Sequence, residues 1–227
     1  MKVAILGNGF VGNATRYYLE KYCPNVKEIV IEDPAQGLHI DDWDNVVFTF
    51  ICVPTDLDGG DDKLSIKIVG QALKRAKGIP VIRSTIGVDH VTLLSLGYNK
   101  KFLHWPEFLR ENHWEEDVNN FDIPIIIGGR DDNRRLLIDS ILTNDNKIIF
   151  ECSAHEAALM KMSRNAMLAA KVAQANMLYG LCDEYDASYD MVKAFLIEDG
   201  TLGTTHWDVP GPDGHLGLSL IHISEPT

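Results

Sequence analysis

Three glycines near the amino terminus have the spacing of a turn that binds a dinucleotide. In "KVAILGNGFVG", Gly7, Gly9 and Gly12 follow an apolar strand and open a helix, in the pattern G-x-G-x-x-G. The first glycine allows a tight turn, the second lets a pyrophosphate approach the backbone, and the third permits close packing of helix on sheet. Phe10 and Val11, at the start of that helix, complete the candidate cofactor-binding turn.

An acidic residue closes the second expected strand, in "IVIEDP", where Asp33 follows Gly12 by about 20 residues. A carboxylate at this position can accept hydrogen bonds from both hydroxyls of a ribose and repels a 2′-phosphate, so the sequence favours NAD over NADP. Glu32 is the competing ribose ligand, and alternation along the strand disfavours it. The alternative is a glycine turn of some other α/β protein, in which Asp33 only caps the next segment.

Several polar residues outside the glycine motif are candidates for catalysis. Lys161 and Asn165 are four residues apart in a long proline-free stretch and so share one face of a helix. Asparagine is a poor helix former and its neighbours here are apolar, which favours a functional pair over a solvated lysine and asparagine. Glu107 comes just after an expected strand, at the edge where open α/β sheets bind ligands. Thr55 and Ser84 also follow strands and are weaker cofactor candidates.

The elements that must position these residues alternate between apolar strands and helices. Strands are expected at 2–6, 28–32, 46–53, 79–83, 101–104 and 123–127, and helices at 11–22, 64–77 and 132–142. This order predicts a doubly wound parallel sheet, the Rossmann type of α/β fold, over residues 1–150.

After this domain the pattern changes to a single helical stretch of about thirty residues, long for a globular protein, which begins near Ser153. Small and apolar residues occupy much of its circumference, so we expect it to be buried against the sheet domain and against a second subunit. A shorter helix, "SYDMVKAFLIED", follows. Residues 151–217 are therefore interpreted as a truncated all-α dimerisation domain, and a homodimer through the long helix is expected.

The overall composition excludes several classes of protein. The chain of 227 residues is 45% hydrophobic and 24% charged, which is typical of a globular protein. Its net charge of −12 argues against binding to nucleic acid or to an anionic membrane. The cysteines stand singly and the histidines match no zinc spacing, so we expect free thiols and no metal site. No signal peptide or membrane-spanning stretch is evident, which favours the cytoplasm.

Further motifs occur in a characteristic order: "FICVPT", "IRSTIG", "WPEFLREN", "EAALMKMSRNAMLAAK" and "VPGPDGHLG". Together with the glycine motif they resemble the UDP-glucose/GDP-mannose dehydrogenase family over residues 1–217. The resemblance implies that NAD oxidises the alcohol of a nucleotide sugar, UDP-glucose in the first instance, to a carboxylate in two hydride transfers. A cysteine thiohemiacetal and then a thioester would connect the two steps.

The resemblance also assigns roles to single residues. Lys161 and Asn165 would stabilise the developing alkoxide, and Glu107 would position or deprotonate the hydrolytic water. Thr85 would lie beside the nicotinamide and the same water, and Glu111 near the cofactor. The substrate pocket would be lined by Lys161, Asn165 and the backbone of Phe108, Leu109, Arg110 and Glu111.

In that family the nucleophilic cysteine lies shortly after the proline–glycine loop, in a segment of the form GFGG-x-C-x-PKD, which this sequence does not reach. The last ten residues, 218–227, read "LSLIHISEPT" and resemble a translated sequencing adapter. We therefore expect an amino-terminal fragment with a non-native tail, inactive in the full reaction for want of the thiol.

Two positions depart from the family. Trp105 stands where many relatives have asparagine, and Thr201 where many have an arginine that helps to bind the nucleotide sugar. The preferred sugar nucleotide is therefore left open. Two other functions also stay open: a single-step β-hydroxyacid dehydrogenase, against which "PEFLRE" and "PGPDG" argue, and a non-catalytic module for NAD binding or dimerisation.

Overall fold

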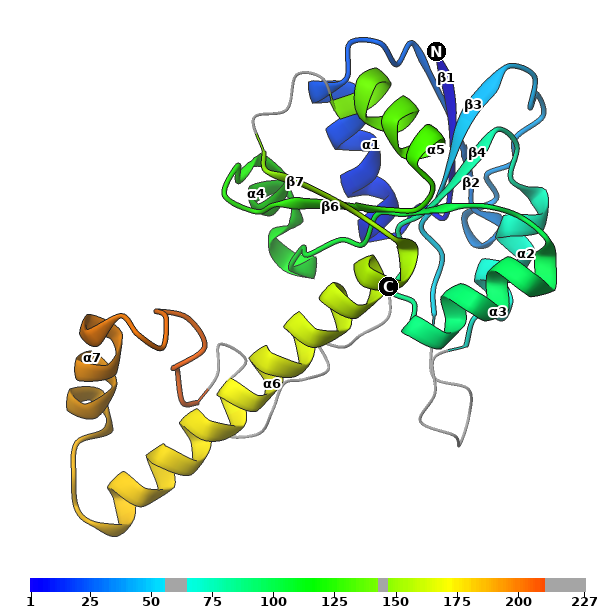
Figure 1. Ribbon diagram of the computed structural model, residues 1–227. Coiled ribbons are helices and arrows are strands. Elements are labelled where there is room, and N and C mark those ends of the chain that lie inside the picture. Colours follow the sequence, from blue (N-terminus) through cyan, green and yellow to red (C-terminus); the bar gives the residue numbers. More distant parts are fainter. Residues whose placement is uncertain (56–64, 143–146, 211–227) are drawn as a thin grey trace. The chain divides into compact units, whose positions relative to one another are not determined.

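The computed structural model describes residues 1–55, 65–142 and 147–210 (Figure 1). The chain divides into two compact units, Met1–Lys161 and Met162–Glu225, each treated by itself below. The turn-rich loop from residue 211 onward and the tail at 218–227 lie outside the described residues, as does the first residue of the helix expected at 64–77.

A sheet of seven strands, in the order β2-β1-β3-β4-β5-β6-β7, forms the centre of the first unit. All neighbouring strands run parallel except β5 and β6, which share one antiparallel pair. The doubly wound α/β fold is thus confirmed, with one antiparallel pair in a sheet that the sequence predicted to be parallel throughout. The strands are β1 (Lys2–Leu6), β2 (Glu28–Glu32), β3 (Val46–Ile51), β4 (Ile79–Ile82), β5 (Leu103–His104), β6 (Ile125–Gly128) and β7 (Ile149–Cys152).

Helices cover both faces of this sheet (Figure 1). On strand β1, which is second from one edge of the sheet, Val3 and Ile5 pack into one core with α1, α4 and α5, whereas Leu6 packs into the other core with α2 and α3. This alternation follows from the two-residue period of a strand, and burial on both faces explains why β1 and β3 are nearly continuous apolar runs. The helices are α1 (Phe10–Tyr22), α2 (Lys67–Arg75), α3 (Val88–Tyr98), α4 (Trp114–Asn119) and α5 (Asp131–Leu137), with a π-helical turn η3 (Ile138–Leu142) and short 3-10 turns η1 (Pro34–Gln36) and η2 (Glu111–His113).

The strand order places a topological switch beside β1, because the chain continues to β2 on one side and then crosses to β3 on the other. In open α/β sheets the carboxyl ends of the strands at such a switch leave a crevice, and ligands bind there. The switch therefore directs attention to the residues that follow β1, β3, β4 and β5.

All six strands predicted from the sequence are present, but the sequence did not predict β7, α3 or the short α4. Strand β7 lies at the edge of the sheet and its residues are only half-buried or exposed, so it lacks the continuous apolar run of the central strands. Helix α3 contains Gly97 and several β-branched residues, and it buries only Val91 and Leu94, so its helical pattern is weak.

The second unit contains most of α6 (Ala154–Glu184), which begins in the first unit, and α7 (Tyr189–Asp199). The long helix and the shorter one after it are both confirmed. The Tyr189 hydroxyl donates to the carbonyl of Trp207 at 2.5 Å, which fixes the segment after α7. Large apolar side chains remain exposed on both helices, among them Met167, Met177, Met191 and Phe195. Across the described residues, no helix has the length and hydropathy that crossing a bilayer requires.

Candidate cofactor and active site

The glycines of the turn between β1 and α1 differ in whether the chain leaves room for a side chain. A Cβ on Gly7, where φ is +95°, would lie 2.2 Å from the carbonyl oxygen of Cys52, and a Cβ on Gly12 would lie 2.1 Å from that of Gly7. The packing of the chain itself therefore demands glycine at both positions. At Gly9, by contrast, an added Cβ would meet no atom within 4 Å, and φ is an ordinary −73°. The space in front of Gly9 is open, as a pyrophosphate lying against the backbone requires.

The amino terminus of α1 opens onto that space. Gly9 is its N-cap and supplies no side chain to the free N–H groups of the first turn, in which Phe10 is half-buried and Val11 is buried. The unpaired N–H groups and the positive end of the helix dipole together favour a bound anion. This arrangement fits the diphosphate of a dinucleotide.

Asp33 lies directly beside the glycine turn. Its Oδ2 accepts a hydrogen bond from the backbone N–H of Asn8 at 2.8 Å, and its Oδ1 accepts from Ala35 at 3.0 Å and from Gln36 at 3.3 Å. Asp33 therefore does cap the next segment, the 3-10 turn η1, and it also ties that segment to the glycine turn. Oδ1 already accepts two hydrogen bonds, but Oδ2 accepts only one and retains a further acceptor position, so this role does not exclude ribose binding.

Glu32, the competing ribose ligand, points elsewhere. Its side chain is buried, and Oε1 pairs with Nη1 of Arg75 on α2 at 2.6 Å. The carboxylate is thus engaged on the α2 side of the sheet, as expected from alternation along β2.

The predicted residues that follow β3 and β4 differ in what they can offer a ligand. The hydroxyl of Ser84 donates to the carbonyl of Val53 at 2.7 Å and so joins the two strands. Thr55 is fully buried, and its hydroxyl has no hydrogen-bond partner among the described residues. A buried hydroxyl without a partner is unfavourable, so Thr55 is available to a polar ligand group in a way that Ser84 is not. Thr85, which directly follows Ser84 in the chain, is also buried.

The structure brings Lys161 and Glu107 together, although 54 residues separate them in the sequence. Nζ of Lys161 lies 3.0 Å from Oε1 of Glu107 and 2.6 Å from its backbone oxygen. Both side chains are more than nine-tenths buried. The other carboxylate oxygen of Glu107 accepts from the N–H of Leu109 at 2.6 Å, and the ring of Phe108 lies 5.3 Å from the Lys161 ammonium.

A second carboxylate holds the same loop. Buried Asp117 on α4 accepts the backbone N–H of Arg110 at 2.7 Å and forms a forked ion pair with its guanidinium. The predicted substrate loop is thus fixed at two successive N–H groups, those of Leu109 and Arg110. Glu111 follows on η2 and is exposed. Asn165 lies about one helical turn beyond Lys161 on α6 and belongs to the second unit.

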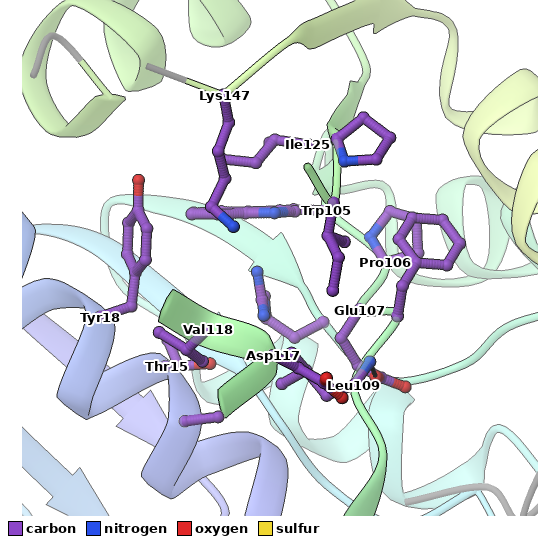
Figure 2. A pocket seen from close by; sticks show the side chains of 15 residues that line it. Thr15, Tyr18, Trp105, Pro106, Glu107, Leu109, Asp117, Val118, Ile125 and Lys147 are labelled. Carbon is purple, nitrogen blue, oxygen red and sulfur yellow. Dashed lines mark hydrogen bonds between the residues drawn. The ribbon is translucent and has the colours of Figure 1, made fainter. Parts of the chain in front are cut away.

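Figure 2 shows a cleft at this edge of the sheet, between α1, α4 and the segment 105–109. Sequence analysis singled out neither Arg83 nor Asp117, both of which line it. Asp117 lies in a run of acidic residues whose spacing indicates no particular function. Arg83 could have been identified as a candidate, because it directly precedes Ser84 at the end of a strand. The lining comprises Ala14, Thr15, Tyr18, Arg83, Trp105, Pro106, Glu107, Phe108, Leu109, Asp117, Val118, Ile123, Pro124, Ile125 and Lys147.

The cysteines do not resemble nucleophiles. Burial raises the pKa of Cys52 to about 11 and also raises the pKa of the half-buried Cys152. Cys23 and Cys182 are buried. Within the described part of the chain, no group of three or more histidine, cysteine, aspartate or glutamate side chains is placed to hold a metal ion.

Comparison with known proteins finds similar folds among solved structures only. No protein-family model and no curated protein sequence matches the chain. Among solved structures, a UDP-glucose dehydrogenase from the hyperthermophilic archaeon Pyrobaculum islandicum matches with a TM-score of 0.73 and 20% identity, over 91% of this chain and 58% of its own. A GDP-mannose dehydrogenase from Pseudomonas aeruginosa matches with 0.72 and 19%, over 92% and 59%. A UDP-D-ManNAc dehydrogenase from Pyrococcus horikoshii matches with 0.74 and 17%, over 90% and 59%.

At these identities the likeness is one of fold. The chain has the fold of the amino-terminal part of these dehydrogenases and spans about three fifths of the length of the solved structures. The resemblance found in the sequence is confirmed at this level.

Proposed function

We propose that this chain carries the NAD-binding domain and part of the catalytic site of a nucleotide-sugar dehydrogenase of the UDP-glucose to UDP-glucuronate type. The observation that carries the proposal is the buried Lys161–Glu107 pair, which lies in the same unit as the open glycine turn and follows a strand of the same sheet. Buried ion pairs are weak contributors to stability, so their retention fits a catalytic use better than a structural one.

The residues that would hold NAD are those of the switch between β1 and β3. The N–H groups of the glycine turn and of Phe10 and Val11 would bind the pyrophosphate, and Asp33 the ribose of the adenosine. Thr55, whose hydroxyl has no hydrogen-bond partner among the described residues, would complete the site together with Thr85. Ser84 would hold the ends of β3 and β4 together through its hydrogen bond to Val53. When bound, NAD supplies the acceptor for the hydride of the alcohol.

Lys161 would stabilise the alkoxide that forms as the hydride leaves. An ammonium has three donors, and Glu107 accepts two of them, which leaves one for the oxygen of the substrate. Because Glu107 orients the ammonium from two sides, the third donor has a restricted direction. We assign Asn165 to the same oxygen.

Glu107 would also position water. Each of its carboxylate oxygens accepts one hydrogen bond from the chain, from Lys161 and from Leu109, and retains a further acceptor site. The loop from Phe108 to Glu111, fixed by Glu107 and Asp117, would present its backbone to the nucleotide sugar. The four cysteines are poor candidates for the thiol of the second oxidation, so the described residues support the first step, from alcohol to aldehyde.

Exposed apolar side chains on α6 and α7 support a homodimer as the form in which the protein acts. Met167, Met177, Met191 and Phe195 are each 65–73% exposed. Size-exclusion chromatography with light scattering of the 227-residue chain tests this part, and a monomer at micromolar concentration would contradict it.

A matched pair of glycine variants tests the cofactor assignment. Gly9→Ala puts a methyl group into space that the chain leaves open, so it should leave the unfolding midpoint unchanged and weaken NAD binding at least tenfold in calorimetry. The control, Gly97→Ala on α3, also meets no atom within 4 Å and should bind NAD as the parent chain does. Absence of heat with NAD in the parent chain would remove the cofactor assignment.

The substrate is tested by NADH absorbance under single-turnover conditions. UDP-glucose, GDP-mannose and 3-hydroxy acids are offered in turn, with Lys161→Met as the inactive control. NADH with a nucleotide sugar alone supports the proposal, and NADH with 3-hydroxy acids alone would favour the single-step β-hydroxyacid dehydrogenase.

A further inference from the structure

Arg83 is a buried cation that forms no ion pair with the residues that the structure describes. It directly follows β4, its side chain lines the cleft of Figure 2, and it is 7% exposed. Its guanidinium carbon lies 4.3 Å from the centre of the Trp105 ring, which is within the range of a cation–π contact. The Nε atom is buried without a hydrogen-bond partner, and no carboxylate of the described residues lies within ion-pair distance.

The acidic groups in the same cleft are already engaged with other cations. Glu107 is paired with Lys161, and Asp117 with Arg110. Glu107 and the thiol of Cys52 act on Arg83 only from beyond ion-pair distance, and the pKa of about 11 keeps that thiol neutral at pH 7. The charge of Arg83 is therefore not balanced locally by the described chain.

An arginine stays protonated under such conditions, although burial lowers its pKa. An unbalanced charge away from water is unfavourable, and proteins that retain one generally satisfy it with an ion or a ligand. The cleft is open to solvent, and the space inside it that small molecules can enter has a volume of about 50 Å³. An anion can thus reach the guanidinium from outside.

The form of the cleft selects among anions. The guanidinium of Arg83 is planar and presents its N–H donors in one plane, which suits the two coplanar oxygens of a carboxylate. The remaining walls are largely apolar, with Val118, Pro124 and Ile125 among them. Such walls favour a small organic acid over a strongly hydrated inorganic phosphate.

We propose that the cleft between α1, α4 and Trp105 binds a small carboxylate through the guanidinium of Arg83. The cleft shares Glu107, Phe108 and Leu109 with the site proposed for the substrate, but the contact proposed here is made by Arg83, to which no role in the dehydrogenase reaction is assigned.

Sodium acetate is the probe, titrated into the 227-residue chain against sodium chloride at equal ionic strength. We expect the unfolding midpoint to rise by about 2–4 °C and then to level off, as for one saturable site. A saturable change in tryptophan fluorescence should accompany it, because the Trp105 ring lies 4.3 Å from the group that binds. If neither measurement shows a saturable response, the proposal is overturned, and water would then solvate Arg83.

Two variants and a control locate the effect. Arg83→Met removes the charge and should abolish the acetate response while unfolding no earlier than the parent chain in chloride, because an unbalanced charge has been removed. Arg83→Lys, which cannot form the fork, should bind acetate about tenfold more weakly. Arg75→Met, which breaks a different ion pair on α2, should keep the full response.

A response to acetate that persists in Arg83→Met would overturn the assignment to this residue. Should Arg83→Met not fold, the fluorescence titration of Arg83→Lys decides, and an affinity equal to that of the parent chain would count against the proposal. Inorganic phosphate is the competing probe, and equal stabilisation by phosphate would overturn the choice of a carboxylate.

Discussion

Replacing His104 by phenylalanine should remove one of the main causes of acid sensitivity in the sheet domain. His104 lies in β5 and is fully buried, and neither ring nitrogen makes a hydrogen bond of good geometry with the described residues. Burial lowers the pKa of the imidazole to about 4, and the charges of Lys161 and Arg83 act in the same direction. The backbone groups of Ala154 and Ser84 oppose the shift only in part.

The sign and size follow from proton linkage. Histidine has a pKa near 6.5 in the unfolded chain, so between pH 6.5 and pH 4 the unfolded state binds more protons and the free energy of unfolding falls as the pH falls. The full difference amounts to about 3 kcal/mol, and about 2 kcal/mol of it is lost by pH 5. Above pH 7 the imidazole is neutral in both states, and this source of pH dependence is absent.

Urea unfolding of the parent chain and of His104→Phe, measured from pH 8 to pH 4.5, provides the assay. Carboxylates titrate in both proteins, so they cancel in the difference between the two curves. We expect that difference to move in favour of His104→Phe by about 2 kcal/mol between pH 8 and pH 5. His39→Gln, which changes an exposed histidine, is the control and should follow the parent chain closely. Parallel curves for the parent chain and His104→Phe would refute the reasoning, because they would mean that the ring takes up its proton in the folded state as easily as in the unfolded one.

Three further predictions concern the site itself. Gly12→Ala should lower the free energy of unfolding by about 1–3 kcal/mol in urea, since its Cβ would lie 2.1 Å from the carbonyl oxygen of Gly7; an unchanged midpoint would show that the turn relaxes freely. Lys161→Met should lower it by about 3–5 kcal/mol, because the carboxylate of Glu107 is left buried and unpaired, and the double variant with Glu107→Gln should recover part of the loss; equal losses in single and double variants would argue against the pair. Asp33→Ala should lower it by about 0.5–2 kcal/mol through loss of the cap on η1, and calorimetry should show weaker NAD binding in addition; intact NAD affinity would mean that Asp33 only caps.

Sequence reasoning was most reliable where local chemistry decides the structure. The apolar runs of β1 and β3 are buried on both faces, so their pattern alone identified them. The conformation of Gly7 and the close contact of Gly12 follow from the glycine spacing. Strand β7 escaped prediction because its stability depends on pairing with β6 rather than on its own pattern.

Contacts across the fold were beyond the reach of spacing. Lys161 and Glu107 are 54 residues apart, and only the packing of α6 beside the end of β5 brings them to 3.0 Å. The alternation rule did separate Asp33 from Glu32. It could not show that Asp33 accepts three backbone N–H groups, because two of these belong to a turn that forms only after the strand has ended.

The three hydrogen bonds of Asp33 have a consequence for how a ligand is received. They connect the turn after β1 with the turn after β2, so the places for a diphosphate and for its neighbouring sugar are joined before anything binds. A dinucleotide would then meet a rigid template, and little of its binding energy would be spent on ordering the protein. Arrival at this end of the molecule should accordingly be a single fast event, without the slow phase that closing a flap would add.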